Sequence, residues 1–468
     1  MEEPFFYHAL HIDTLRCIGC SHCMRSCVTE AIRISNGKAK LYPNRCIDCG
    51  HCYIVCPMTA IDVAQDDFNT IFQYDYRVVL LPAVFMAQFS DQLKRDISPS
   101  EIRESLMSLG FTHVFEIEQV VDLLAEEQIA YVKEHADIKP LISTFCPAVV
   151  RLIQVKFPAL TGNMMLLKQP SEVAAMYYKQ KLLREGAAEN EIGLFYVTPC
   201  AAKIAAIKTP VGEEKSEIQG VINMDFLFNR ILKDIKNRKG KLPTEENRAD
   251  PRDYISPKGL LWSLPEGESR YAVGRSLSID GIEHISDYLE KLEDIEDSNV
   301  DFLELKGCAK GCSGGVLVRG LRFLIAEEMR NRAFLSASMQ AQNTHPGLDK
   351  EIWESIKNRL TTNKVLPRSM MKLDKDLQVA MQKMEHIRET LRLLPQKDCG
   401  VCGAPSCLAF AEDIANDRAE LKNCVFLQTY LEEKGNMQAE ERVDIFKTIW
   451  GEDIFKNEKD FSIKKNKH

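Results

Sequence analysis

Sixteen cysteines carry the most specific chemistry in this 468-residue chain. Eight of them form two runs with the same C-x2-C-x2-C-x3-C spacing, from Cys17 to Cys27 and from Cys46 to Cys56. Loops of this spacing hold 4Fe-4S cubes, and the fourth cysteine of each run ligates the cube of the other run. We predict two such clusters, held by Cys17, Cys20, Cys23 and Cys56 and by Cys46, Cys49, Cys52 and Cys27. Zinc is the less favoured alternative, because zinc sites usually pair C-x-x-C units across longer gaps.

A third cysteine group lies near the end of the chain. Its spacing is C-x2-C-x4-C-x16-C, and its members are Cys399, Cys402, Cys407 and Cys424. Interspersed glycines allow the backbone to wrap closely around a cluster, and a helical pattern from Leu408 to Lys422 brings the last cysteine back to it. The sequence predicts a third 4Fe-4S cluster, with zinc again as the alternative. The motif resembles the small 4Fe-4S domain of electron-transfer subunits from anaerobes.

The four remaining cysteines, Cys146, Cys200, Cys308 and Cys312, are too far apart for one local loop. The first three each follow a predicted strand, and Pro147 after Cys146 suits the first turn of a helix. Open α/β sheets bind their ligands at the carboxyl ends of strands, so three strand ends can bring these thiols together. The alternative is four unconnected cysteines, because a free cysteine often packs as a small apolar side chain.

The hydrophobic pattern indicates which elements position these thiols. From about Tyr76 to Ile325 helical patterns alternate with six apolar runs that indicate strands: Val78–Leu81, His113–Ile117, Leu141–Phe145, Ile192–Val197, Gly220–Met224 and Val300–Leu305. This alternation predicts an α/β domain with largely parallel sheets. The repeated cysteine runs predict a smaller domain of the bacterial ferredoxin type before it.

We therefore divide the chain into five predicted segments. They are a two-cluster ferredoxin-like domain over residues 1–72, the α/β domain over 73–371, a linking helix over 372–395, a C-terminal 4Fe-4S domain over 396–430 and a tail over 431–468. Apolar residues recur at helical spacing in the linking helix, from Leu373 to Leu391. We expect this face to pack on the main domain or on a second copy in a homodimer.

Composition limits the compartment and the partners. The start of the chain lacks a basic, apolar leader and no apolar stretch is long enough to cross a membrane, so we expect a cytoplasmic protein without a membrane partner. Cytosolic thiols are kept reduced, which favours metal binding over disulfides. A formal charge of −8 argues against a nucleic-acid partner, because phosphate binding needs a basic face.

The isolated cysteines lie in three short motifs that resemble those of the FeFe hydrogenases. The motifs are Thr144-Phe145-Cys146-Pro147, Thr198-Pro199-Cys200-Ala201-Ala202-Lys203 and Glu304-Leu305-Lys306-Gly307-Cys308 through Cys312-Ser313-Gly314-Gly315. The resemblance runs from the ferredoxin unit to about Phe323. It implies an H-cluster, in which Cys146, Cys200, Cys308 and Cys312 hold a 4Fe-4S cube and Cys312 bridges to a two-iron centre with CO and CN ligands. It also implies that Lys203 contacts a cyanide ligand.

Departures from the family pattern predict slow chemistry. The relay cysteine of catalytic members is replaced by Phe145, and the relay serine falls on Met165. A phenyl ring cannot transfer a proton. Of two relay acids Glu127 is kept and Ala130 replaces the other, while Thr198 and Lys306 replace methionines of the two-iron site. Glu304 and Lys306 share a strand face with Cys308 and are the first candidates for another proton route.

This pattern resembles the sensory branch of the family, groups C and D. Many sensors of that branch continue into a PAS domain, which does not occur in this sequence. We expect a slow or sensory hydrogenase that interconverts hydrogen with protons and electrons, with a ferredoxin-type redox partner and a possible signalling partner. The alternative is a non-catalytic iron–sulfur assembly or electron-transfer protein that lacks the two-iron centre. Retention of Lys203 and of the full eight-cysteine unit favours the first.

Overall fold

The computed structural model describes residues 6–89, 97–213, 215–237, 255–294, 298–340, 348–368, 373–374 and 376–455. The chain divides into two compact units. The first comprises Met1–Ala9, Ile47–Gly50 and Val63–Arg368, and the second comprises Leu10–Cys46, His51–Asp62 and Ser369–His468. Most of the predicted ferredoxin-like segment thus shares a unit with the C-terminal segment, whereas Met1–Ala9, Ile47–Gly50 and residues 63–72 belong to the first unit.

Two parallel sheets form the centre of the first unit. The larger has the order β6-β5-β8-β9, with bounds His113–Glu116, Tyr76–Leu81, Ile192–Thr198 and Gly220–Asn223. The smaller has the order β10-β11-β7, with bounds Ser276–Asp280, Phe302–Lys306 and Leu141–Ile142. All six predicted strands are present and parallel, as the alternating pattern indicated. Strand β10 was not predicted, because its residues are only half-buried and its apolar run is weak.

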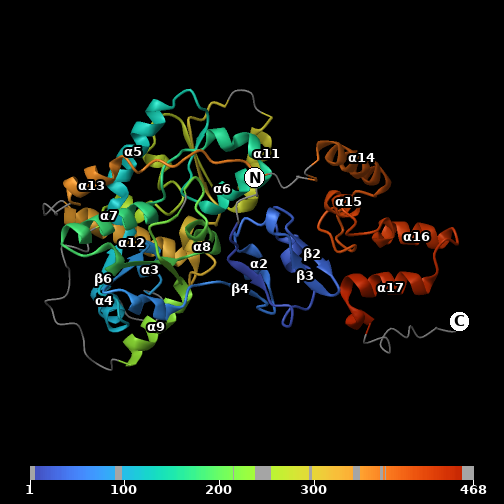
Figure 1. The fold of residues 1–468 in the computed structure, drawn as a ribbon, viewed down its shortest axis with the longest axis horizontal. Helices are drawn as coiled ribbons and strands as arrows, with labels where there is room; N and C mark the ends of the chain where they lie inside the picture. The colour runs from blue at the N-terminus through green and yellow to red at the C-terminus, as the bar shows by residue number, and fades with distance from the viewer. Residues whose placement is uncertain are drawn as a thin grey trace. The chain divides into compact units, whose positions relative to one another are not determined.

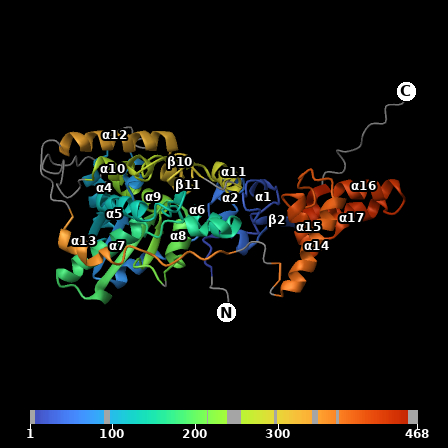
Figure 2. The same cartoon turned by 90° about the horizontal axis from the view of Figure 1, so that it is seen from above.

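Helices cover both faces of the larger sheet (Figure 1). Helices α4 and α9 pack together near β6 and β9, whereas α7 packs against β5 and β8. Figure 2 shows α12 and α7 on opposite sides of this unit. The helices of the unit are α3 (Ala83–Ala87), α4 (Pro99–Ser108), α5 (Val121–Glu134), α6 (Pro147–Lys156), α7 (Pro170–Arg184), α8 (Ala201–Lys208), α9 (Met224–Asn237), α10 (Pro257–Leu261), α11 (Ile282–Leu292), α12 (Arg322–Gln340) and α13 (Lys350–Lys357).

Burial explains why these segments form strands. Every residue of β8 is buried, as expected of a central parallel strand with a face against each helical layer. Strand β5 beside it is buried from Val78 to Leu81. The larger sheet therefore offers a rigid edge at the carboxyl ends of its strands, from which Cys200 follows β8.

The second unit contains the repeated cysteine loops and the C-terminal helices. Short strands β1 (Leu10–Ile12) and β4 (Ile61–Val63) pair with each other, and β2 (Ile32–Ser35) pairs antiparallel with β3 (Lys38–Leu41). Each cysteine loop leads into a one-turn helix, α1 (His22–Arg25) or α2 (His51–Val55). This equivalence reflects the internal repeat in the sequence.

The C-terminal segment is more ordered than predicted. The linking helix is present as α14 (Leu377–Leu393), but most of its apolar face is exposed, with Leu377 at 75% and Met381 at 65%. Helices α15 (Cys407–Ala415), α16 (Val425–Glu433) and α17 (Ala439–Trp450) follow. The prediction of a tail from residue 431 was therefore wrong for the residues up to the end of α17. Ile445 and Ile449 of α17 are buried together with Met437 in a small core. Residues from 456 onward lie outside the described part of the chain.

The helices among the described residues do not include one long and apolar enough to cross a membrane.

A buried ion pair joins α6 to the start of the first unit. Arg151 is 1% exposed and donates to Asp48, whose carboxylate also accepts from His8 and from the backbone N–H of Ala9, each at 2.9 Å. The Arg151 guanidinium also stacks on Phe6, 3.7 Å from the ring centre. Removing one partner of a buried pair leaves the other charge unpaired in a dry environment.

We therefore expect Arg151→Met to destabilise the first unit by about 3 to 5 kcal/mol. Denaturant unfolding followed by near-UV circular dichroism measures this loss. Arg184→Met is the matched control, because Arg184 forms an exposed ion pair with Glu351 and such pairs contribute about 0 to 1 kcal/mol. Equal unfolding midpoints for the two variants would contradict the assignment.

Candidate metal centres

Three strand ends bring four thiols to one cavity in the first unit. Cys146 follows β7, Cys200 follows β8, and Cys308 follows β11, with Cys312 in the next turn. All four line one cavity, whose empty space together with the open solvent at its mouth is about 740 Å³. The convergence takes place between two sheets, because β7 and β11 belong to the smaller sheet and β8 to the larger.

Local sequence determines how each thiol is presented. Cys146 and Cys200 both occupy the N-cap position, of α6 and α8 respectively, and Pro147 is the first residue of α6. The positive end of each helix dipole therefore lies at a cysteine, which favours the thiolate form. The turn that carries Cys312 is held by its N–H, which donates to the carbonyl of Ser263 at 2.9 Å. Gly311 has φ +64°, and a Cβ there would overlap that same carbonyl.

Burial dominates the protonation of these thiols. It raises the pKa of Cys200 to about 12 and raises the pKa of Cys308 well above its ordinary value, although Lys203 lowers that of Cys200. Without a metal the thiols of Cys200 and Cys308 are therefore neutral at pH 7. Four thiols with room between them fit a cubane cluster, since binding replaces each thiol proton with a bond to iron.

Lys203 adds a positive charge to the same cavity. It lies three residues beyond Cys200 on α8, is 8% exposed, and has its Nζ 5.6 Å from the centre of the Tyr196 ring. Burial lowers the pKa of Lys203, but Tyr196, Cys312 and Cys200 together raise it by more. The net pKa therefore lies above its ordinary value. Among the described residues no carboxylate forms an ion pair with Lys203. Its charge is therefore available to an anionic group in the cavity.

Lys306 and Glu304 have different surroundings from those expected of a free relay. Lys306 lines the cavity, but its ammonium is paired with the buried carboxylate of Glu268, which in turn accepts from the hydroxyl of Ser143. Glu304 accepts from the backbone N–H of Glu268 and Ser269, at 3.1 and 2.7 Å. Glu304 does not line the cavity and positions the Glu268 loop. Glu268 and Ser143 were missed, since neither lies in a recognisable motif.

The predicted relay positions separate into two groups. Phe145 lines the cavity, with its ring 6.0 Å from that of Trp262. Met165 is fully buried in the core and Ala130 is exposed on α5, and neither lines the cavity. Glu127 also lies on α5, outside the cavity lining, and forms an ion pair with Lys357 at 2.7 Å. Glu127 therefore does not line the cavity of the thiols, and the structure does not support a relay role for it.

A further acid, Glu118, was not predicted. It lines the cavity, is buried, and accepts from the backbone N–H of Ala83 at 2.8 Å. It lies in the 3-10 turn Ile117–Val120 after β6. Its position at the end of a predicted strand was the available signal, but a single acid after a strand is common.

The first predicted ferredoxin set of cysteines converges in the second unit. Cys17, Cys20, Cys23 and Cys56 line one apolar pocket, which is the grouping predicted for the first ferredoxin cluster. Backbone N–H groups point at sulfur, as in Ala39 to Cys17 at 3.3 Å and Ala60 to Cys56 at 3.2 Å. Such donors stabilise a thiolate. Of the second predicted set, Cys27, Cys46 and Cys52 lie in this unit and Cys49 in the first unit.

The C-terminal cysteines also form one pocket. Cys399, Cys402, Cys407 and Cys424 line it together with Phe410 and Leu394. Cys407 begins α15, where the Ser406 hydroxyl caps the helix by accepting from the N–H of Ala409 at 3.1 Å. Cys424 lies directly before α16. The fourfold thiol arrangement and apolar lining fit a cubane cluster.

Family models match three parts of the chain. Residues 76–257 match the iron only hydrogenase large subunit, C-terminal domain, residues 16–61 match the 4Fe-4S dicluster domain, and residues 394–426 match a family of Fe-S cluster sequences. Residues 76–257 are therefore similar to the iron only hydrogenases. Cys146 and Cys200 of the hydrogenase-like domain lie inside the first match, whereas Cys308 and Cys312 lie beyond it.

Solved structures and one curated protein are also similar. A variant of the [FeFe]-hydrogenase HydA1 from Chlamydomonas reinhardtii is 15% identical, with 63% of this chain and 96% of that chain covered at a TM-score of 0.47. A HydA(deltaEFG) structure is also 15% identical, with 63% of this chain and 95% of that chain covered at a TM-score of 0.47. The large subunit of the corrinoid/iron-sulfur protein of Moorella thermoacetica is 46% identical over 39 residues, 8% of this chain. The match spans only 9% of that relative's length.

We expect Glu118 to be protonated at neutral pH. Burial raises its pKa from 4.5 to about 8, although the N–H of Ala83 lowers it. An infrared carboxylic-acid band should thus be lost as pH rises through about 8, and the Glu118→Gln variant should lack that band. Its contribution to stability should be complete below about pH 4.5 and lost as pH rises through about 8, because only the folded state keeps the proton in that range.

Glu126→Gln on the exposed side of α5 is the control and should keep the band. An acid band that is present and unchanged in Glu118→Gln would contradict the assignment.

Proposed function

We propose that this chain is a slow or sensory FeFe hydrogenase that catalyses reversible hydrogen oxidation and proton reduction. The observation that carries the proposal is the convergence of Cys146, Cys200, Cys308 and Cys312 on one cavity that also contains Lys203. An ordinary 4Fe-4S site needs the thiols alone. A buried lysine without a carboxylate partner among the described residues fits an additional anionic group, such as a two-iron centre with cyanide ligands.

The residues of the cavity have separate tasks in this proposal. The four cysteines hold the cube of the H-cluster, and Cys312 attaches the two-iron centre, which supplies the site of hydrogen chemistry when bound. Lys203 stabilises its negative charge. Phe145 and Trp262 close the apolar side and exclude water, while Glu118 is a buried acid that can hold a proton at the cavity wall.

Electrons reach the cavity through further 4Fe-4S clusters in this proposal. We propose three of them, two bound by the N-terminal runs and one by the C-terminal group, in addition to the H-cluster. Cys49 belongs to the first unit and is close enough to Cys308 to contribute, after burial and the neighbouring thiols, to its raised pKa. A ligand of a ferredoxin cluster beside a ligand of the H-cluster is a suitable entry point. The proposed partners are a ferredoxin-type redox protein, protons and hydrogen, with a signalling partner or a second copy as further candidates.

A second function is a non-catalytic iron–sulfur assembly or electron-transfer protein without the two-iron centre. Phe145 favours this alternative, because a ring stands at the cavity wall where catalytic relatives carry a thiol. Such a protein would bind the cube and leave Lys203 without an anionic partner. Infrared spectroscopy separates the two, since CO and CN bands appear only if the two-iron centre binds.

We expect wild-type protein loaded with a two-iron precursor to show CO and CN bands, and Cys312→Ser to lose them. A hydroxyl is a poor replacement for a bridging thiolate. Cys402→Ser is the control and should keep the bands, because it removes a ligand of the C-terminal pocket in the other unit. An unchanged infrared spectrum in Cys312→Ser would show that another residue forms the bridge.

Hydrogen turnover should be limited by proton delivery. Phe145 removes the relay thiol, and loss of one positioned acid–base group typically costs about 10² to 10⁴ in rate. We expect hydrogen evolution by fully loaded protein, at saturating reductant, to fall below that of a catalytic relative by at least this factor. Phe145→Cys alone should help little, because Met165 and Ala130, the other replaced relay positions, do not line the cavity and leave a thiol there without a continuing relay. Wild-type turnover equal to that of the catalytic relative would reveal an unrecognised proton route.

A further inference from the structure

In the second unit, C-terminal residues complete the free edge of the β2–β3 hairpin. The N–H of Ile34 donates to the carbonyl of Gly403 at 2.8 Å, and the N–H of Asn36 donates to Thr448 at 2.9 Å. Next to these, the N–H of Gly37 donates to Ile449 at 3.0 Å. An open edge presents unpaired backbone donors that invite pairing with another chain. Here we call these three hydrogen bonds the edge contact.

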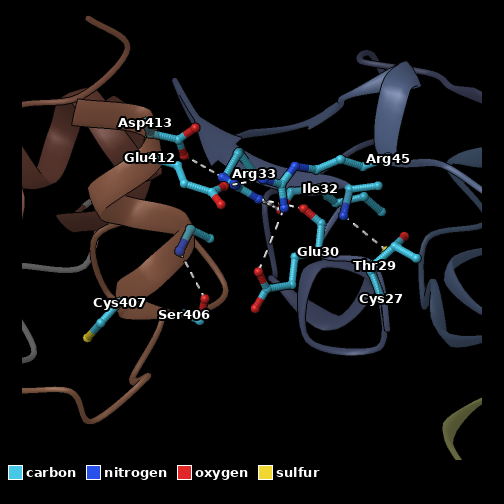
Figure 3. Close-up of polar contacts among 12 residues, drawn as sticks. Cys27, Thr29, Glu30, Ile32, Arg33, Arg45, Ser406, Cys407, Glu412 and Asp413 are labelled. Carbon is cyan, nitrogen blue, oxygen red and sulfur yellow. Dashed lines mark hydrogen bonds and ion pairs between the residues drawn. The ribbon is translucent and has the colours of Figure 1, made fainter. Parts of the chain in front are cut away.

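Two buried ion pairs also join the ferredoxin-like segment to α15 (Figure 3). Arg33 pairs with Asp413, and Arg45 pairs with Glu412, with all four side chains at most 12% exposed. Both acids lie on α15, which begins at the ligand Cys407. Both arginines lie in the ferredoxin-like segment, and Arg45 directly precedes Cys46. Buried pairs depend on geometry, because desolvation offsets much of their attraction unless both charges stay paired. The pairs therefore fix the register of α15 against β2.

Glycines of the C-terminal cysteine loop permit a close approach to the first ferredoxin pocket. Gly403 has φ +84°, and a Cβ there would overlap the carbonyl oxygen of Ile34. Gly400 has φ +75°, and its added Cβ would lie 3.1 Å from the methyl group of Met24. Met24 is buried and directly follows the ligand Cys23. The C-terminal cysteine loop thus lies directly against the backbone of β2 and against the side chain of Met24.

A short route of bonds connects the two pockets. It starts at Cys402, a lining residue of the C-terminal pocket, and continues to the carbonyl of Gly403 in the next residue. One hydrogen bond leads to Ile34, whose side chain lines the pocket of Cys17, Cys20, Cys23 and Cys56. Electron tunnelling weakens steeply with distance, and a path with one hydrogen bond and no solvent gap is a favourable one.

We infer that the C-terminal 4Fe-4S cluster exchanges electrons directly with the cluster of Cys17, Cys20, Cys23 and Cys56 across the edge contact, in a register that the two buried ion pairs fix. In one step, a reduced C-terminal cluster loses one electron and the first ferredoxin cluster gains it, while an external one-electron donor of the ferredoxin class reduces the C-terminal cluster again. The inference needs the two cubane clusters but no hydrogen chemistry. It therefore can hold even if the proposed hydrogenase function fails.

Electron paramagnetic resonance of the dithionite-reduced full-length chain tests this directly. Each reduced 4Fe-4S cluster carries an unpaired spin, and two neighbouring spins split or broaden each other's signal. The expected wild-type spectrum shows such coupling. The spectrum should contain a coupling contribution that is absent both from Cys402→Ser, which lacks the C-terminal cluster, and from Cys20→Ser, which lacks the first ferredoxin cluster.

Two variants separate the contact from the clusters themselves. Gly403→Ala should lose the coupling, since its Cβ displaces the carbonyl of Ile34. Gly435→Ala is the matched control, because Gly435 also has a positive φ, +72°, but has no atom within 4 Å of an added Cβ. The double variant Arg33→Gln/Arg45→Gln should weaken the coupling while both cysteine loops stay intact. Arg388→Gln, which removes an exposed ion pair with Glu385, is its control.

Iron content decides which variant is informative. If Gly403→Ala binds less iron than wild type, the arginine variant with full iron decides the outcome. Loss of the coupling in a fully loaded variant, with wild-type coupling in its control, supports the inference. The inference would be overturned if no coupling contribution of wild type were absent from both Cys402→Ser and Cys20→Ser, and also by unchanged coupling in both fully loaded variants.

Discussion

The central cavity depends on one constraint, which is that thiols from distant parts of the chain must meet within the reach of one cluster. Cys146, Cys200 and Cys308 can meet only because β7, β8 and β11 end at the same place. Parallel strands make this possible, since all their carboxyl ends lie at one edge of a sheet. The fourth thiol, Cys312, needs a tight turn instead, and Gly311 with its positive φ provides it. The helices that pack on the strands of the first unit fix the positions of these strand ends.

Charge balance is the second requirement of such a buried site. Thiolates and an anionic cluster are costly in a dry cavity unless positive charge lies nearby. Two helix N-termini and Lys203 supply that charge, whereas Lys306 is already neutralised by Glu268. The two lysines are therefore not equivalent, although both line the cavity. Lys203 acts on the contents of the cavity, whereas Lys306 is a wall residue held by Glu268 behind it.

Sequence predicted the groups with short, regular spacing and the strands with long apolar runs. Local spacing predicted the cysteine sets of the first ferredoxin pocket and of the C-terminal pocket. Continuous apolar runs predicted β5 and β8, whose residues from Val78 to Leu81 and from Ile192 to Thr198 are buried. It did not reveal Glu118, Glu268 or Ser143, because each acquires its role only through tertiary neighbours. It also placed a tail where α17 packs, since an amphipathic helix gives no sign of its partner. Counting along the chain placed the family's relay serine at Met165, but a residue count carries no information about depth, and Met165 lies in the core.

The second unit shows why buried charge can be retained where apolar contact would give equal stability. Replacing a buried ion pair with well-packed apolar residues is often neutral or stabilising, so Arg33–Asp413 and Arg45–Glu412 are poorly explained by stability alone. Apolar surfaces tolerate sliding, whereas two separate ion pairs are satisfied in only one register. A one-residue shift of β2 would exchange the donors of the edge contact and move Ile34 away from Gly403. Because electron transfer depends steeply on distance, a fixed register between two cysteine loops is a property that apolar packing would not secure.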